Sequence, residues 1–292
     1  LFWKYDILFS YFYRYSFFAA LLAKCFGKKT YFTGGIDSLD SDYASAFNYK
    51  IQALFFKLCY WVADSCIIVS QSDLKNIFKV SSLKKKLSYS EHVINTKLFI
   101  ADVPKEKIFT SIVWMGDEGN VVRKGVDKAL QIFAELKKIP EFVDYRFVII
   151  GRKGEGEVLV RSIIDKYNLK GSVELKGEVS EEDKINLLKQ SKYYFQLSLY
   201  EGFGLAALEA LCANNIIIHS GKGGLANPIY KEQLLFDIDN DFDSELLKLV
   251  NKLACFTPIT SYDNLLEYYD IQRRKDDFEA IIVNGKSNYK LK

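Results

Sequence analysis

Short apolar segments alternate with longer amphipathic segments along most of the chain, and this alternation limits the possible folds more than any other feature. Strands are predicted at residues 6–10, 29–33, 65–70, 110–114, 146–150, 173–176, 193–197 and 216–219. Helices are predicted at residues 16–26, 48–63, 126–138, 159–167, 181–190 and 204–213, with a long loop between residues 116 and 126. Buried strands separated by helices of about ten or more residues indicate parallel βαβ units. The sequence therefore predicts an α/β protein with doubly wound sheets.

The chain divides into two predicted domains. Its 292 residues suggest about two domains, and residues 95–107 lack periodicity and contain Pro104. We therefore expect an N-terminal Rossmann-like domain over residues 1–100. A C-terminal Rossmann-like domain over residues 101–292 is expected to include a helical segment at about 258–283. Residues 1–94 offer about four strands and three helices, fewer than a complete domain of this type needs, so we expect the N-terminal domain to be incomplete here.

Cysteine usage and hydropathy predict a cytoplasmic location. The five cysteines are scattered and form no C-x-x-C motif, which favours single buried thiols in a reducing compartment over a disulfide framework or a metal site. The most apolar stretch, residues 7–23, is interrupted by Arg14 and is too short and too polar to predict a transmembrane helix.

Charge is distributed unevenly along the chain. Residues 1–100 hold 13 Lys and Arg against 7 Asp and Glu, whereas residues 101–292 hold 27 against 30. Many of the aromatic residues also lie in the first part. This composition suits peripheral contact with an anionic membrane at the inner face, and equally a basic face exposed to water. Nothing beyond mild basicity indicates nucleic-acid binding.

The segment most informative about function is LYEGFGLAALEA at residues 199–210. A predicted strand ends just before it, a glycine-containing turn follows at residues 201–204, and a helix begins at once. Glycines allow close backbone approach to a ligand, and the free N–H groups of a helix start suit a phosphate. Glu209 follows Glu201 by eight residues, about two helical turns. The two carboxylates can therefore contact different parts of one extended ligand.

This segment resembles the signature of the retaining glycosyltransferases of GT-B family 4. The resemblance continues in order along the chain, at Arg123-Lys124-Gly125 before a helix, FVIIG at 147–151, VELKGEV at 173–179 and SGKGG at 220–224. It covers about residues 110–230 well and residues 29–100 more loosely. It implies two Rossmann-like domains in the GT-B arrangement and transfer of a sugar from a nucleotide diphosphate sugar. This sequence departs from the family pattern at GGLANP, residues 223–228, which lacks the carboxylate that the family usually has there.

The resemblance also implies roles for particular residues. Lys124 and Arg123 would hold the donor diphosphate, and Glu201 would contact the donor sugar at the reacting centre. Donor contacts would also come from Glu209, at the ribose hydroxyls, and from the backbone of a further set: Gly151, Gly177, Glu178, Val179, Gly202, Phe203, Gly204 and Leu205. No metal-ligand cluster is found in the sequence. We therefore expect neither a metal nor a cofactor beyond the nucleotide sugar, which is the donor substrate.

Acceptor-side residues are indicated more weakly. Gly35 and Asp37 follow a predicted strand end, and His92 precedes the linker. The implied acceptor is a glycan or a lipid-linked glycan, in cell-surface polysaccharide synthesis. Two other functions stay open on the sequence: a non-catalytic module that binds nucleotide sugars, and a sugar-nucleotide epimerase with the GT-B architecture. A nicotinamide oxidoreductase is disfavoured because no strand leads into a G-x-G-x-x-G that opens a helix.

Overall fold

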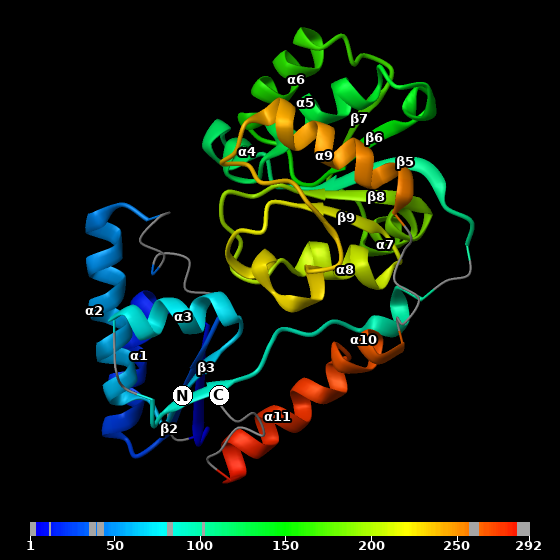
Figure 1. Cartoon of the computed structure of the whole chain (residues 1–292). Helices are drawn as coiled ribbons and strands as arrows, with labels where there is room; N and C mark the ends of the chain where they lie inside the picture. Colours follow the sequence, from blue (N-terminus) through cyan, green and yellow to red (C-terminus); the bar gives the residue numbers. More distant parts are fainter. Residues whose placement is uncertain are drawn as a thin grey trace. The chain divides into compact units, whose positions relative to one another are not determined.

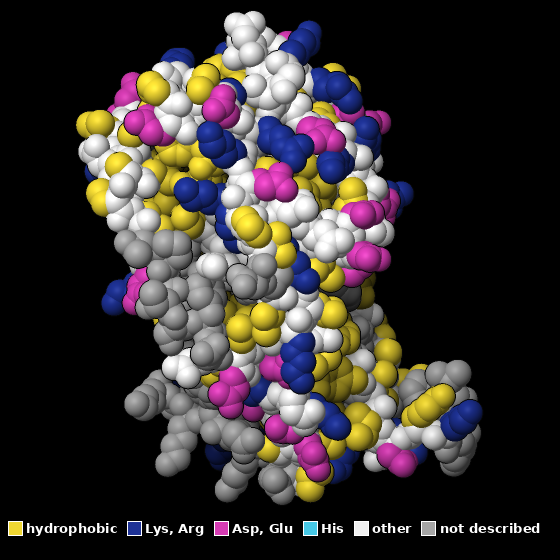
Figure 2. Space-filling model, turned by 90° about the vertical axis from the view of Figure 1, so that its right-hand side faces the viewer, with side chains coloured by type: hydrophobic (Ala, Val, Ile, Leu, Met, Phe, Trp, Pro, Cys, Tyr) yellow, Lys and Arg dark blue, Asp and Glu magenta, His cyan; other side chains and the backbone are white. Residues whose placement is uncertain are grey.

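A computed structural model describes residues 4–11, 13–34, 39, 44–80, 84–100, 103–256 and 263–284 of the chain (Figure 1). It divides into two compact units. Unit 1 comprises residues 1–93 and 271–292, and unit 2 comprises residues 94–270. None of the described helices is both long enough and apolar enough to span a membrane. On the side drawn in Figure 2, basic and acidic side chains are interspersed.

Unit 1 is built on a parallel sheet with strand order β1-β2-β3-β4. Its strands alternate with three helices, and a fourth helix comes from the end of the chain: β1 (Ile7–Ser10), α1 (Tyr13–Cys25), β2 (Lys29–Thr33), α2 (Ala46–Val62), β3 (Ser65–Ile68), α3 (Gln71–Val80), β4 (Leu87–Tyr89) and α11 (Ile271–Asn284). Apolar residues of α1, α2 and α3 pack with Phe32 and Ile68 in one core. A smaller cluster joins Tyr31 and Ile67 to Ile281 of α11. The sheet is thus covered on both faces, as parallel sheets require.

The division into units differs from the boundary expected from the sequence. The helical segment at about 258–283 is predicted to lie in the C-terminal domain, but α11 belongs to unit 1. The physical reason is long-range packing: Ile281 is buried against unit 1 strands, and Asp277 accepts a hydrogen bond of 2.9 Å from Ser90. The shorter helix α10 (Asp263–Tyr268) stays with unit 2, where Asp270 after it pairs with Ile94.

Unit 2 contains a six-stranded parallel sheet with strand order β10-β9-β8-β5-β6-β7. Its further elements follow the alternation seen in the sequence: β5 (Glu106–Ile112), α4 (Glu118–Arg123), α5 (Val126–Leu136), β6 (Arg146–Ile150), α6 (Gly156–Lys166), β7 (Val173–Gly177), α7 (Glu181–Gln190), β8 (Ser191–Gln196), α8 (Leu205–Cys212), β9 (Ile216–His219), β10 (Leu234–Leu235) and α9 (Phe242–Cys255). The predicted α/β class with parallel sheets is confirmed.

One local expectation is wrong. The segment between residue 116 and α5 is predicted to be a loop, but it contains α4. The Asp117 side chain accepts a hydrogen bond of 2.7 Å from the Asn120 amide, which caps this short helix. A helix of six residues without an apolar stripe gives little periodic signal, so the sequence pattern does not reveal it.

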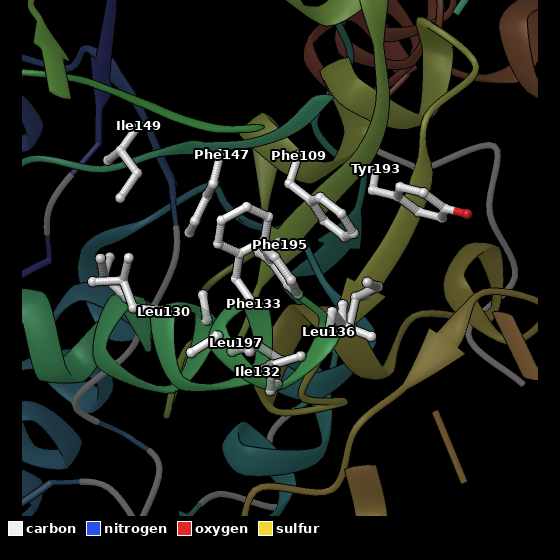
Figure 3. Packing of buried hydrophobic residues seen from close by; sticks show 14 of the residues in the cluster. Phe109, Leu130, Ile132, Phe133, Leu136, Phe147, Ile149, Tyr193, Phe195 and Leu197 are labelled. Atoms are coloured by element: carbon white, nitrogen blue, oxygen red, sulfur yellow. The ribbon is translucent and has the colours of Figure 1, made fainter. Parts of the chain in front are cut away.

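The core of unit 2 is rich in aromatic side chains (Figure 3). Phe109, Phe147 and Phe195 lie on three neighbouring strands and point toward α5, where Phe133 meets them. The rings of Phe109 and Phe195 are stacked with their centroids 5.0 Å apart, and Phe133 approaches Phe109 edge-on at 5.5 Å. Each such ring buries a large apolar area. This packing fixes the strands β5, β6 and β8, whose carboxyl ends carry the polar residues described next.

Candidate functional site at the switch point of unit 2

The strand order of unit 2 reverses between β5 and β8. From β5 the chain continues through β6 to β7 on one side, and then returns to β8, β9 and β10 on the other. Loops that leave the carboxyl ends of two such strands diverge and open a crevice, which is where doubly wound sheets bind ligands. The loop after β5 leads to Arg123 and Lys124, and the loop after β8 holds residues 197–204. The topology therefore brings both parts of the predicted site to one place.

Lys124 and Glu201 form an ion pair at this point. The Lys124 ammonium lies 2.8 Å from Oε2 and 3.1 Å from Oε1 of Glu201. Their side chains are 21% and 16% exposed, so water can reach the pair but does not surround it. The two residues are 77 positions apart in sequence. A cation and a carboxylate are thus held at the edge of the sheet where a ligand can contact both.

The backbone fixes the distance between the two loops. The Leu199 amide donates a hydrogen bond of 2.8 Å to the Arg123 carbonyl. Gly125 has a φ of +68°, and a Cβ atom there would lie 2.0 Å from the carbonyl oxygen of Leu197. Only glycine fits this contact, because any side chain would clash with the neighbouring backbone. Lys124 is therefore held next to the loop of Glu201 by main-chain packing as well as by its own ion pair.

Two residues not selected from the sequence hold the Glu201 carboxylate in place. Gln196 Nε2 donates to Glu201 Oε2 at 3.1 Å, and Ser198 Oγ donates to the same oxygen at 3.0 Å. The Tyr194 hydroxyl in turn donates to Gln196 Oε1 at 3.2 Å. Tyr194, Gln196 and Ser198 are all buried. Tyr194 and Gln196 alternate along β8 and Ser198 follows two residues after its end, and this spacing is the signal that could have identified them, since alternate residues of a strand share a face.

Helix α8 begins beside this carboxylate. Gly204 is its N-cap, with a left-handed φ of +88°, and contributes no capping side chain. A Cβ atom on Gly204 would lie 3.5 Å from Glu201 Cγ, so Glu201 lies close to the start of the helix. The first amides of a helix have no intrahelical acceptor and carry a partial positive charge. Leu205 is exposed at this end, whereas Phe203 is buried. The helix start thus offers amide donors next to the Lys124–Glu201 pair.

Glu209 lies farther along α8 and is paired with Lys184, which is not part of the motif at residues 199–210. Lys184 Nζ contacts Glu209 Oε1 at 2.9 Å and Glu181 Oε1 at 2.8 Å. Burial raises the pKa of Glu209, and the ion pair with Lys184 offsets part of this shift. Burial alone would lower the pKa of Lys184, but its hydrogen bonds to the two glutamates raise it. Lys184 therefore stays charged and holds one oxygen of Glu209.

The remaining predicted donor residues lie on the same edge of the sheet, on the other side of β5. Gly151 directly follows β6, and its amide donates to the Gly177 carbonyl at the end of β7 at 2.8 Å. Glu178 is exposed, and Val179 packs partly against a small apolar cluster. The strand order places these residues one and two strands beyond β5. The structure thus brings the predicted donor residues to the carboxyl edge of a single sheet.

Arg123 and the predicted acceptor residues are placed differently. The Arg123 guanidinium donates to Asn120 Oδ1 at 3.0 and 3.2 Å, within the same short helix. His92 belongs to unit 1, where its Nδ1 accepts a hydrogen bond of 2.6 Å from Arg274. Gly35 and Asp37 lie outside the described residues. Their predicted roles stay predictions.

The site offers cations, amides and carboxylates. Among the residues that the structure describes, no group of three or more His, Cys, Asp or Glu could hold a metal ion. A lysine beside a helix start can stabilise negative charge on phosphate oxygens, and a half-buried carboxylate can accept hydrogen bonds from sugar hydroxyls. A parallel sheet with these groups at its switch point is typical of α/β proteins that bind phosphorylated ligands.

Comparison with known proteins identifies the class more closely. Residues 119–254 match the family model described as "Glycosyl transferases group 1". Among solved structures, Anabaena Alr3699/HepE in complex with UDP has a TM-score of 0.77 at 12% identity and covers 96% of this chain and 79% of its own. Sucrose-phosphate synthase from Thermosynechococcus elongatus has a TM-score of 0.70 at 21% identity, covering 97% and 72%. The chain therefore has the GT-B fold, and the predicted resemblance to GT-B glycosyltransferases is confirmed.

Curated relatives cover part of the chain. A GDP-mannose:cellobiosyl-diphosphopolyprenol alpha-mannosyltransferase from Xanthomonas oryzae pv. oryzae is 32% identical over 163 residues, which are 49% of this chain and 40% of the relative. One component of the human phosphatidylinositol N-acetylglucosaminyltransferase is 30% identical over 105 residues, covering 36% of this chain and 21% of the relative. The matched regions thus span less than half the length of these relatives.

Proposed function

We propose that this chain is a retaining glycosyltransferase that transfers a sugar from a nucleotide diphosphate sugar to a lipid-linked or glycan acceptor in cell-surface polysaccharide synthesis. The proposal rests chiefly on one observation. Lys124 and Glu201 meet at the switch point of unit 2, within 2.8 Å of each other and beside the glycine-initiated start of α8. The family match over residues 119–254 includes both residues.

In the proposed mechanism, Lys124 and the first amides of α8 bind the donor diphosphate. Breaking the bond to the sugar leaves negative charge on the diphosphate oxygens, and a fixed cation with aligned amides stabilises that charge more in the transition state than in the bound donor. Lys124 has three N–H donors, so it can contact phosphate oxygens while it keeps a hydrogen bond to Glu201. The chain thus supplies a cation of its own for the leaving group.

Glu201 is the proposed partner of the donor sugar at the reacting centre. Its Oε2 accepts hydrogen bonds from Gln196 and Ser198, which fixes the orientation of the carboxylate. Glu209, whose Oε1 is held by Lys184, is proposed to accept hydrogen bonds from the ribose hydroxyls. Main-chain groups near Gly177 and Val179 would contact the base. HepE is a UDP complex and one relative is named for GDP-mannose, and both support a nucleoside diphosphate sugar as the donor class without selecting the base.

The names of the relatives favour a lipid-linked acceptor. One is a mannosyltransferase named for a diphosphopolyprenol-linked sugar, and another is a component of a transferase named for phosphatidylinositol. An acceptor anchored in a bilayer would require the enzyme to work at the membrane surface. We therefore propose an acceptor whose sugar or headgroup is presented at the cytoplasmic face of a membrane.

Donor turnover by the full-length protein tests this proposal. Lys124→Ala and Glu201→Gln should each lower kcat/KM at least about tenfold, a loss of about 1.4 kcal/mol of transition-state stabilisation. Lys166→Ala, an exposed lysine on α6 in the same unit, is the matched control and should keep wild-type turnover. Unchanged rates in both site variants would refute the assignment of these residues.

Further measurements on the same protein separate the alternatives. Nucleotide binding in calorimetry without any transfer or donor hydrolysis would indicate a non-catalytic binding module. Conversion of the donor sugar itself would indicate an epimerase. NMR of the transferred sugar reports whether the anomeric configuration is retained, and turnover in the presence of EDTA reports whether a divalent metal is required.

A further inference from the structure

The outer face of helix α1 is lined with exposed aromatic and apolar side chains. Tyr15 is 81% exposed and Phe18 is 71% exposed, and Leu22 and Phe26 continue the row toward and past the end of the helix. These residues recur three or four positions apart, so they share one side of the helix. The opposite side carries Tyr13, Phe17, Ala20 and Ala23, which are buried in unit 1. Helix α1 is thus apolar on both sides, and the described part of unit 1 covers only one of them.

Helix α2 carries a second exposed row in which apolar and basic residues alternate. Phe47 is 73% exposed and Trp61 is 72% exposed, with Leu54 exposed between them. Lys50 and Lys57 occupy the intervening exposed positions of the same row. The spacing 47, 50, 54, 57 and 61 matches one side of an α-helix. This side presents aromatic rings flanked by ammonium groups.

The two rows belong to one surface of unit 1. Buried residues of both helices pack into a single core on the same face of the sheet. The helices also contact each other, with the rings of Phe17 and Phe55 edge-on at 6.1 Å. They run side by side in Figure 1. Because each row lies opposite the buried side of its helix, both rows face away from the sheet. We call these rows together the outer surface of α1 and α2.

Helices α1 and α2 carry basic but no acidic residues. Their 13 and 17 residues include Arg14, Lys24, Lys50 and Lys57, of which Lys24 is paired at 2.8 Å with Asp64, just after α2, so that its charge is offset. Lys86 adds a cation at the end of α2, where its ammonium donates to the carbonyls of Tyr60 and Trp61 at 3.2 and 2.9 Å. The face drawn in Figure 2 differs, since acidic and basic side chains are interspersed there. An acidic or uncharged partner thus fits the outer surface of α1 and α2 better than a basic one.

We propose that the outer surface of α1 and α2 binds the headgroup region of an anionic lipid bilayer. Aromatic rings with a polar edge partition into the interface between water and hydrocarbon, and nearby lysines are attracted to anionic headgroups. The alternation of Phe47, Leu54 and Trp61 with Lys50 and Lys57 supplies both contributions on one helix. The proposal rests on the proposed function only in that a lipid-linked acceptor would place the enzyme at a membrane.

Vesicle binding by the full chain tests this inference without requiring turnover. Sedimentation with vesicles of phosphatidylcholine alone, and of phosphatidylcholine mixed with phosphatidylglycerol, should show binding chiefly to the anionic vesicles, weakened by added salt. Lys50→Ala combined with Lys57→Ala should lower the apparent affinity at least about tenfold. Phe47→Ser combined with Trp61→Ser should lower it by a similar factor, and this loss should be less sensitive to salt.

Matched controls make the result specific to this surface. Lys166→Ala with Lys170→Ala removes the same charge from unit 2, and Leu247→Ser removes an exposed apolar residue of α9. Both controls should bind as the wild type does. Lys124→Ala should also bind vesicles normally, so a failed donor site and a failed membrane surface give different results.

Three outcomes would overturn the proposal. The first is equal binding of the wild type to neutral and anionic vesicles, or no binding to either. The second is wild-type affinity in both surface variants when circular dichroism shows that they are folded. The third is a loss of self-association in the same variants on size-exclusion chromatography without a change in vesicle binding, which would identify the surface as a contact between two copies of the chain.

Discussion

Both units bury aromatic side chains in their cores, and unit 1 also carries rows of strongly exposed ones. In unit 2, Phe109, Phe147 and Phe195 are buried beneath the strand ends that carry the site. In unit 1, the most exposed aromatic residues, such as Tyr15 and Trp61, lie on the outer sides of two helices. An aromatic ring in a core fixes neighbouring strands, whereas a ring on the surface is available to a partner. The difference indicates that unit 2 is organised around a rigid site and unit 1 around an outer surface.

Alanine substitutions at glycines of the two units test how rigidly the main chain holds the site. Gly125→Ala should cause the largest loss, because its Cβ would lie 2.0 Å from the Leu197 carbonyl and its φ is +68°. Backbone strain and overpacking together should lower the free energy of unfolding by about 3 kcal/mol or more and abolish most turnover. Urea denaturation and donor turnover measure the two effects.

Two other glycines serve as controls for this substitution. Gly27 in unit 1 and Gly171 in unit 2 have φ values of +70° and +83°, but a Cβ there would meet nothing within 4 Å. Alanine at either position should lower the free energy of unfolding only through the strain of a left-handed backbone, by about 1 kcal/mol. If Gly125→Ala is no worse than these controls, main-chain packing does not hold Lys124 beside the loop of Glu201.

The two histidines of the chain, one in each unit, allow a comparison by acid titration. Burial, and in His92 the neighbouring Arg274, lowers the pKa of His92 to about 4, and burial lowers that of His219 to about 4. A histidine kept neutral in the folded state takes up its proton on unfolding. The free energy of unfolding that each neutral histidine contributes is therefore fully present above about pH 6.5. It is lost as the pH drops toward 4, by at most about 3 kcal/mol per histidine.

Replacing a histidine by glutamine should remove the part of the pH dependence of the unfolding free energy that this histidine causes. His219→Gln and His92→Gln should each show a smaller fall in unfolding free energy between about pH 6.5 and 4 than the wild type does. Calorimetry at a series of pH values separates the two units if they unfold in distinct transitions. A wild-type slope in both variants would show that carboxylates, rather than histidines, dominate acid unfolding.

Much of the fold and part of the site could be predicted from the sequence. The helix predicted at 48–63 is observed at Ala46–Val62, because its apolar spacing is regular. The Lys124–Glu201 pair follows from motif and topology, since both residues lie in loops after strands that the order of the sheet makes neighbours. Contacts far apart in sequence could not be predicted, such as Lys184 with Glu209 and the packing of α11 on the strands of unit 1. Strand β10 has two residues, too few for any periodicity.

Substitution of Gln196 is the next prediction, since this positioning residue lies outside the segment at residues 199–210 that suggests the site. Gln196→Leu keeps the size of the side chain but removes the donor to Glu201 Oε2 and the acceptor for Tyr194. We expect kcat to fall about tenfold, because a buried hydrogen bond to a charged group contributes about 1.5–3 kcal/mol, while affinity for the nucleotide diphosphate changes little.

A split between turnover and binding distinguishes positioning from general damage to the fold. Gln190→Leu, on α7 in the same unit, is a matched control and should leave both parameters unchanged. Equal losses in nucleotide affinity and in turnover for Gln196→Leu would mean that this side chain supports the sheet rather than orienting Glu201.

The smallest predicted effects compare one helix cap in each unit. At the start of α3, Ser70 Oγ accepts a hydrogen bond of 3.0 Å from the backbone amide of Asp73. At the start of α7, Ser180 Oγ accepts one of 3.0 Å from the backbone amide of Asp183. Ser180 is exposed, so Ser180→Ala should lower the free energy of unfolding by about 1 kcal/mol or less. Ser70 is buried, and water cannot replace the lost acceptor, so Ser70→Ala should cost up to about 2 kcal/mol. Thermal unfolding of the two variants measures this difference. Equal shifts would mean that burial of the cap adds nothing, and a larger shift for Ser180→Ala would mean that α7, which carries Lys184 to Glu209, limits the stability of unit 2.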